Sequence, residues 1–195
     1  VIEVKLSSGK FSEIDYEKVP SKASLLYRKA FNKRDGERYR SYLTAVEKGE
    51  AKINASVVYP YEIIRPIEQG SENDPVALKT LDLQWKNQPN WLADNPHKGL
   101  VVADVSGSMM GQPILVSVSL AIYFAERNVG PFKDTFLTFS SRPALQHITG
   151  QTIAEKVRSL NRGGWEMNTD IQAAFNLILN TAKQYNIKPD DMPTA

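Results

Sequence analysis

The chain has 195 residues, of which 42% are hydrophobic and 24% are charged, and this composition excludes wholesale disorder, collagen and disulfide-rich scaffolds. Lysine and arginine number 24 and aspartate and glutamate 22, so the net charge of +2 does not by itself indicate a nucleic-acid or membrane partner. There is no cysteine, which excludes thiolate metal sites, and the two histidines, His97 and His147, form no zinc signature. No apolar run reaches about 18 residues, so we expect no membrane span, and the lack of cysteine is compatible with the cytoplasmic location that we expect.

The first part of the chain is predicted to be helical. Pro20 suits the first position of a helix, and apolar residues recur at helical spacing through residues 20–34. Tyr39, Leu43 and Val46 recur at i, i+4 and i+7, which predicts a second helix and therefore a helical hairpin.

Proline and asparagine divide the remainder of the first half. Residues 54–66 contain two prolines, which favour a short extended or single-turn connector over a long helix. Asp74 and Pro75 predict the N-cap and the first position of a further helix, and the Pro- and Asn-rich stretch after that helix predicts a linker. We therefore expect a helical segment and linker at residues 1–98 and a second domain at residues 99–195.

The second half alternates apolar, β-rich runs with amphipathic helices. Residues 100–105 are a continuous apolar run broken only by Asp104, which predicts a strand buried on both faces of a parallel sheet. A tight turn between the next two strands predicts an antiparallel hairpin. The predicted strands are 100–105, 135–139 and 144–148, and the predicted helices are 113–127, 152–160 and 170–185. This order is typical of the first half of an open, mostly parallel α/β sheet with flanking helices.

Asp104, Ser106 and Ser108 stand at a spacing of two residues at the end of the first predicted strand. Ligands of open α/β sheets bind at the carboxyl ends of the strands. A lone buried carboxylate is costly unless it is paired or binds a cation, and one carboxylate with several hydroxyls suits Mg²⁺ better than Ca²⁺. The alternative is that Asp104 and Ser106 only satisfy backbone amides of the turn. If the metal interpretation holds, Asp104→Ala should abolish metal binding and leave the fold intact or slightly more stable, because it removes an unpaired buried charge.

The sequence DVSGS at residues 104–108 resembles the first loop of the metal-ion-dependent adhesion site (MIDAS) of von Willebrand factor A domains. The resemblance implies a Rossmann-like α/β domain that binds a divalent cation. The family's second loop supplies a threonine, and the segment before the last predicted helix looks like that loop, so Thr169 takes this role. The family's third loop supplies an aspartate that would lie beyond Ala195, so we expect a longer gene product and an incomplete A domain here. Because the family sheet places its first strand between the second and the fourth, we expect residues 100–105 to lie at a sheet edge.

The same motifs, with a helical segment upstream, resemble the Ro autoantigen and its relatives (TROVE-like proteins), in which helical repeats precede an A domain. A narrower family of Ro-like proteins shares the sequences KVPSKA at residues 18–23 and GEAKIN at residues 49–54, and also the turn at Pro131 and Phe132. This resemblance covers most of the chain. It implies RNA binding as an alternative function, although the residues before Gly99 are too few to build the large helical ring of Ro-like proteins.

Basic residues concentrate in residues 18–40, a stretch that contains eight basic and two acidic residues. Lys22, Lys29 and Lys33, here called the lysine stripe, would share one face of the predicted helix and offer a phosphate-binding surface. The alternative is an ordinary solvated helix face whose interleaved aromatic residues belong to the core.

The sequence carries no signature of an enzyme: there is no P-loop and no G-x-S-x-G, and neither serine of the DVSGS motif has a plausible general base. We expect no catalysis. We expect a Mg²⁺-dependent protein-binding module, in which Asp104, Ser106, Ser108 and Thr169 hold the ion and leave one position for an acidic side chain of a partner, as the A-domain resemblance implies. The alternatives are a Ro-like RNA-binding protein that uses the lysine stripe, and a structural assembly domain with a vacant metal site.

Overall fold

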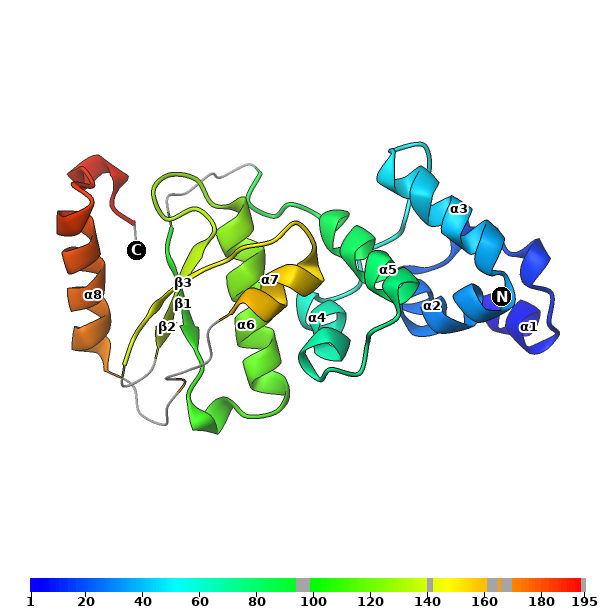
Figure 1. The fold of residues 1–195 in the computed structure, drawn as a ribbon, viewed down its shortest axis with the longest axis horizontal. Coiled ribbons are helices and arrows are strands. Elements are labelled where there is room, and N and C mark those ends of the chain that lie inside the picture. Colours follow the sequence, from blue (N-terminus) through cyan, green and yellow to red (C-terminus); the bar gives the residue numbers. More distant parts are fainter. Residues whose placement is uncertain (94–98, 140–141, 161–164, 166–169, 194–195) are drawn as a thin grey trace. The chain divides into compact units, whose positions relative to one another are not determined.

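The computed structural model describes residues 1–93, 99–139, 142–160, 165 and 170–193. It is an α/β protein (Figure 1). The chain divides into two compact units, Val1–Pro89 and Asn90–Ala195, of which the first is helical and the second holds a sheet. Within the residues described, no helix is both long enough and apolar enough to cross a membrane.

Five α-helices and two short 3₁₀ turns build the first unit. They are α1 (Ile2–Ser7), η1 (Phe11–Glu13), η2 (Tyr16–Lys18), α2 (Ser21–Arg34), α3 (Gly36–Glu47), α4 (Pro60–Glu68) and α5 (Pro75–Lys86). The helices α2 and α3 confirm the predicted hairpin. The predicted N-cap is also confirmed, because the Asp74 side chain accepts a 3.0 Å hydrogen bond from the N–H of Val76.

The prediction of a short extended or single-turn connector at residues 54–66 is wrong, because the nine-residue helix α4 begins there and continues to Glu68. Pro60 occupies the first helical position, where a missing N–H costs nothing, and the Glu62 carboxylate accepts a 2.9 Å hydrogen bond from the N–H of Tyr59. The second proline lies inside the helix, which should weaken it. Burial of Ile63, Ile64 and Ile67 on one face offsets that cost.

Aromatic side chains fill the core of the first unit. Tyr16 lies against Phe31 and Tyr39, with ring centroids 5.3 and 5.0 Å apart. The Tyr39 hydroxyl shares a 2.9 Å hydrogen bond with Thr80, and burial of the ring raises the pKa of Tyr39 to about 12. These aromatic residues are therefore structural, which agrees with the core interpretation of residues 18–40.

A buried carboxylate ties α2 to the loop before α5. The Glu72 side chain is 1% exposed, and it pairs with the Arg28 guanidinium at 2.7 Å and with the Lys29 ammonium at 3.3 Å. Asn32 adds a 3.0 Å hydrogen bond to the Asp74 carboxylate at the start of α5. Because the Arg28 side chain is largely buried, loss of Glu72 would leave its positive charge inside the unit without the carboxylate that pairs with it.

A three-stranded mixed sheet with flanking helices forms the described part of the second unit. Its elements are β1 (Val101–Asp104), η3 (Gly107–Met109), α6 (Gln112–Arg127), β2 (Thr135–Phe139), β3 (Leu145–His147), α7 (Ile153–Ser159), α8 (Ile171–Gln184) and η4 (Pro189–Asp191). The strand order is β1-β2-β3; β1 and β2 are parallel, and β2 and β3 form the predicted antiparallel hairpin. The strand β1 lies at the edge of this sheet, as expected.

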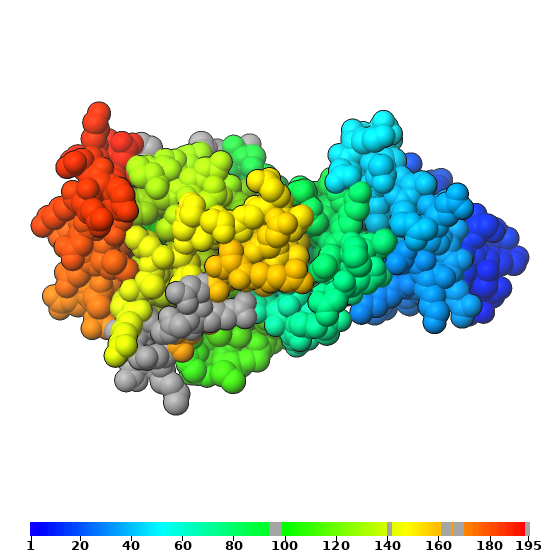
Figure 2. Space-filling view, viewed as in Figure 1, coloured from blue at the N-terminus to red at the C-terminus, as the bar shows by residue number. Residues whose placement is uncertain are grey.

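The two faces of the sheet are covered unequally. Figure 1 shows α6 and α7 on one side of the sheet and α8 on the other. On β1, Ala103 is 2% exposed whereas its neighbour Val102 is 49% exposed, so the prediction of a strand buried on both faces is wrong. The helix α8, orange to red in Figure 2, packs against β2, and its residues Ile171 and Phe175 remain exposed. An apolar run predicts a strand, but it does not predict whether a second layer covers it.

Candidate metal centre

The turn after β1 is held by its own hydrogen bonds. The Asp104 carboxylate accepts a 2.9 Å hydrogen bond from the N–H of Ser106, and the carbonyl of Ser106 accepts one of 2.9 Å from Met109. The turn ends at Gly111, whose φ of +90° favours glycine, and α6 starts at the next residue. The DVSGS motif is thus a compact turn at the carboxyl end of a strand, where α/β sheets bind their ligands.

Two hydroxyl groups meet in this turn. The Oγ atoms of Ser106 and Ser108 are 3.1 Å apart, and they share a hydrogen bond. Neighbouring ligands of an octahedral Mg²⁺ ion, each about 2.1 Å from it, lie about 3.0 Å from one another. Ser106 is 4% exposed whereas Ser108 is exposed, so the pair has one buried member and one that faces solvent. The spacing and chemistry of the two oxygens therefore fit two adjacent positions of a hard cation.

Asp104 is less isolated than the sequence predicted. It is half-buried rather than buried, and its Oδ1 atom accepts the hydrogen bond from the N–H of Ser106. This is the role that the alternative interpretation assigned to it. The premise that Asp104→Ala relieves an unpaired buried charge is therefore wrong, and removal of the carboxylate costs a backbone hydrogen bond.

The second loop of the predicted site is only partly described. Thr169 lies outside the described residues. The next residue, Asp170, is the N-cap of α8, and its carboxylate accepts a 2.8 Å hydrogen bond from the N–H of Ala173. Figure 1 shows the amino end of α8 at the same end of the sheet as the carboxyl end of β1. The structure thus brings together Asp104, Ser106 and Ser108, and leaves Thr169 as a prediction.

The predicted ligand set differs from a carboxylate-rich or histidine-rich metal site. Over the part of the chain that the structure describes, no three His, Asp or Glu side chains gather as a group that could hold a metal ion. The predicted set has one carboxylate and otherwise hydroxyl oxygens, which is a composition that Mg²⁺ accepts because it retains several of its waters.

Met110 is a residue near this site that the sequence did not single out. It follows the η3 turn directly, and its side chain is 76% exposed. A methionine in a turn carries no signal of exposure in the sequence, and only the fold shows that this one reaches solvent beside the two serines.

The lysine stripe does not form a free cationic surface. Lys22 pairs with Glu62 at 3.2 Å, and Lys29 pairs with the buried Glu72. Lys33 is exposed in the last turn of α2. Two of the three lysines therefore have carboxylate partners within their own unit.

Comparison with known proteins divides the chain near the boundary between its two compact units. Residues 98–194 match the model of a family described as a domain of unknown function (DUF7788). Residues 1–95 match a second family, also described as a domain of unknown function (DUF2828). The chain is 30% identical over 207 residues to the uncharacterized protein L728 of Acanthamoeba polyphaga mimivirus; the match covers 98% of the chain and 36% of the viral protein, so the chain spans about a third of that relative. No solved structure matches the chain.

Proposed function

We propose that the second unit is a metal-dependent protein-binding module of the von Willebrand factor A type. In this proposal Asp104, Ser106 and Ser108, together with Thr169, hold Mg²⁺ and leave a position for an acidic side chain of a partner protein. The observation that carries it is the pair of serine oxygens 3.1 Å apart in a turn at the carboxyl end of β1.

Each described residue has a distinct part in this proposal. Asp104 supplies negative charge, and its hydrogen bond to the N–H of Ser106 orients the carboxylate over the turn. The buried hydroxyl of Ser106 anchors the site, and the exposed Ser108 marks the side from which a partner approaches. Mg²⁺ held mainly by neutral oxygens retains most of its positive charge and so attracts a carboxylate. Met110, exposed beside the turn, offers the partner an apolar contact.

Calorimetric titration of the chain with Mg²⁺ and Mn²⁺ tests this proposal. Asp104→Asn should abolish metal binding, because it removes the negative charge. It should preserve the turn, because asparagine keeps a side-chain oxygen that can accept the hydrogen bond from the N–H of Ser106. Ser108→Ala should weaken metal binding. Acetate serves as a minimal acidic side chain, and it should bind in Mn²⁺ and not in EDTA.

Asp134→Asn is the matched control, because Asp134 lies before the amino end of β2, away from the site, and asparagine tolerates its φ of 55°. This variant should bind metal as the unmodified chain does. Metal affinity that is unchanged by Asp104→Asn, or acetate binding that is equal in EDTA, would refute the proposal.

The Ro-like RNA-binding alternative has less support. Lys22 and Lys29 would have to give up their ion pairs with Glu62 and Glu72 to contact phosphate groups. Each exchange reduces the net electrostatic gain that drives binding to nucleic acid.

A further inference from the structure

A second candidate site lies at the opposite end of β2 from the proposed metal centre. It is a pocket of about 620 Å³, a volume in the range of small-molecule sites. Thr135, the first residue of β2, lines the pocket, whereas Phe139, the last, is the strand partner of Asp104. The two sites are therefore separated by the length of a strand.

One wall of the pocket is the hydrogen-bonded end of α8. Asn186 has a φ of 51°, its N–H bonds the carbonyl of Lys183 at 3.3 Å, and the N–H of Ile187 bonds the carbonyl of Ala182 at 2.9 Å. This pair of bonds is the Schellman motif that closes many helices. The motif sets the direction of the chain after α8, so the positions of Tyr185 and Ile187 in the wall follow from it.

The facing wall is a turn between α6 and β2. The Asn128 side chain, 8% exposed, bonds both the carbonyl and the N–H of Gly99 and lies 3.4 Å from the carbonyl of Phe132. The N–H of Asp134 bonds the carbonyl of Ala125 at 2.9 Å. These bonds hold the turn against α6, and they keep the Phe132 ring, 4% exposed, at the base of the pocket.

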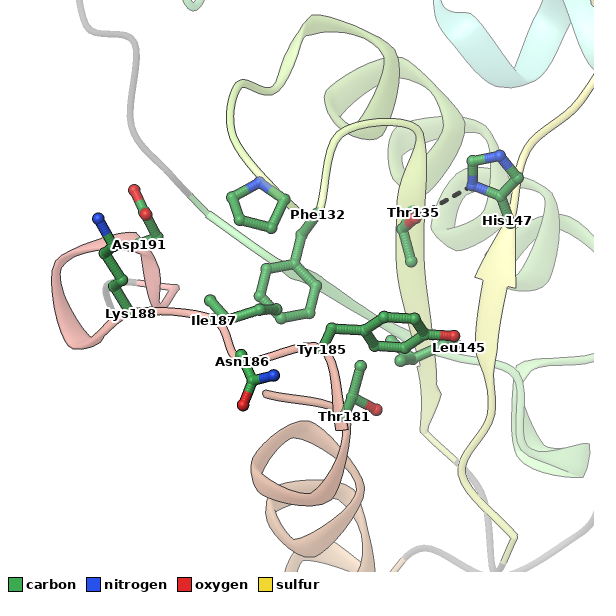
Figure 3. Close-up of a pocket in the computed structure, with 11 residues that line it drawn as sticks. Phe132, Thr135, Leu145, His147, Thr181, Tyr185, Asn186, Ile187, Lys188 and Asp191 are labelled. Atoms are coloured by element: carbon green, nitrogen blue, oxygen red, sulfur yellow. Dashed lines mark hydrogen bonds between the residues drawn. The ribbon is translucent and has the colours of Figure 1, made fainter. Parts of the chain in front are cut away.

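The lining is mostly apolar in the middle, where Thr181 and Asn186 add polar groups, and it is polar at its two ends (Figure 3). Phe132, Leu145 and Ile187 form the middle, and the Tyr185 ring reaches from α8 toward the strands although 69% of its surface is exposed. Figure 3 shows His147 and Thr135, joined by a 3.3 Å hydrogen bond, at one end of the pocket.

The other end carries one cation and one anion. Lys188 and Asp191 lie there on the same side of the pocket (Figure 3). Among the described residues no carboxylate lies within ion-pair distance of Lys188. A ligand that carries a carboxylate and an ammonium close together would match both charges, whereas a phosphate dianion would meet the Asp191 carboxylate unfavourably.

We propose that this pocket binds a free aromatic α-amino acid. The carboxylate would face Lys188, the ammonium would face Asp191, and the ring would lie between Tyr185 and Phe132. An aromatic ring gains from contact with other rings beyond the area that it buries, which accounts for an exposed tyrosine at the mouth of an apolar pocket.

Three probes separate the contributions of the ligand's groups. They are L-tryptophan, indole-3-propionate, which lacks the ammonium, and tryptamine, which lacks the carboxylate. Binding is measured by calorimetry and by amide chemical shifts of the 195-residue chain in EDTA, so that the proposed metal site does not contribute. L-tryptophan should bind most tightly and shift the amides of Thr135, Leu145 and Ile187.

The expected effects of substitution differ by probe. Lys188→Gln should weaken L-tryptophan and indole-3-propionate by up to about fivefold and leave tryptamine unchanged. Asp191→Asn should weaken L-tryptophan and tryptamine and leave indole-3-propionate unchanged. Tyr185→Ser should weaken all three probes by about tenfold.

Two matched controls lie on α8 outside the pocket. The exposed fraction of Phe175, 68%, is nearly that of Tyr185, and Lys183 is an exposed lysine five positions before Lys188 in the sequence. Phe175→Ser and Lys183→Gln should leave the affinity for all probes unchanged. The proposal is overturned if L-tryptophan shows no saturable binding below about 10 mM, or if it binds no more tightly than the other two probes. It is also overturned if Phe175→Ser weakens binding as much as Tyr185→Ser, or Lys183→Gln as much as Lys188→Gln. Equal effects of Lys188→Gln and Asp191→Asn on all three probes would overturn it as well. Melting curves of each variant establish that it folds.

Discussion

Replacement of Asp104 by asparagine and by alanine separates the structural role of this residue from its proposed role as a metal ligand. Its Oδ1 atom accepts a 2.9 Å hydrogen bond from the N–H of Ser106, and its side chain is half-buried. Alanine removes both the charge and the acceptor. Asparagine removes the charge and keeps an oxygen at the same place.

The expected magnitudes follow from this geometry. Without metal, Asp104→Ala should lower the free energy of unfolding by about 1 kcal/mol, the net value of one hydrogen bond, and Asp104→Asn by much less. If the site has a Kd of about 1 mM, addition of 10 mM Mg²⁺ stabilises the unmodified chain by about 1.4 kcal/mol. That gain corresponds to roughly 5 °C or more in Tm for a unit of this size. Both variants should lose this gain.

Thermal melts with 10 mM Mg²⁺ and with EDTA measure both effects, with Asp134→Asn as control. In EDTA the order of Tm should be unmodified chain, then Asp104→Asn, then Asp104→Ala. A Tm of Asp104→Ala in EDTA that equals or exceeds that of the unmodified chain would refute the structural role of the hydrogen bond. If Mg²⁺ still raised the Tm of Asp104→Asn, the ion would bind at another place.

Three further expectations concern the first unit. Glu72→Gln should lower the free energy of unfolding in urea by about 3 kcal/mol, because it leaves the largely buried Arg28 guanidinium without its carboxylate, whereas Glu47→Gln at an exposed pair should change it by less than about 0.5 kcal/mol. The pKa of Tyr39 is raised from 10 to about 12, so the protonated tyrosine contributes about 3 kcal/mol of stability, which is present below pH 10 and is lost as pH rises through 12; Tyr39→Phe should flatten that decline in alkaline melts. Simultaneous change of the lysine stripe to glutamine should leave RNA affinity and its salt slope unchanged, and a slope that falls by about two or three would revive the RNA alternative.

Local chemistry in the sequence predicted the helix starts and the turn of the candidate site. Asp74 and Asp170 stand directly before amphipathic runs, and both are observed as N-caps. A short polar side chain at such a position accepts a hydrogen bond from an N–H two or three residues on, whatever the rest of the fold does. The same reasoning predicted the compact turn that holds Ser106 and Ser108, since its hydrogen bonds join residues within a few positions.

Contacts between distant residues decided the rest. The helix α4 forms around two prolines because its isoleucines are buried in the first unit, and Lys22 and Lys29 pair with carboxylates that are about 40 residues away in the chain. Exposure of Val102, and the pocket between Phe132 and the end of α8, depend on which elements cover the sheet. By itself the sequence determined the elements that local hydrogen bonds and periodicity specify. Only the tertiary structure decided which faces are covered and which charges are paired, because those depend on the packing of segments that are far apart in the chain.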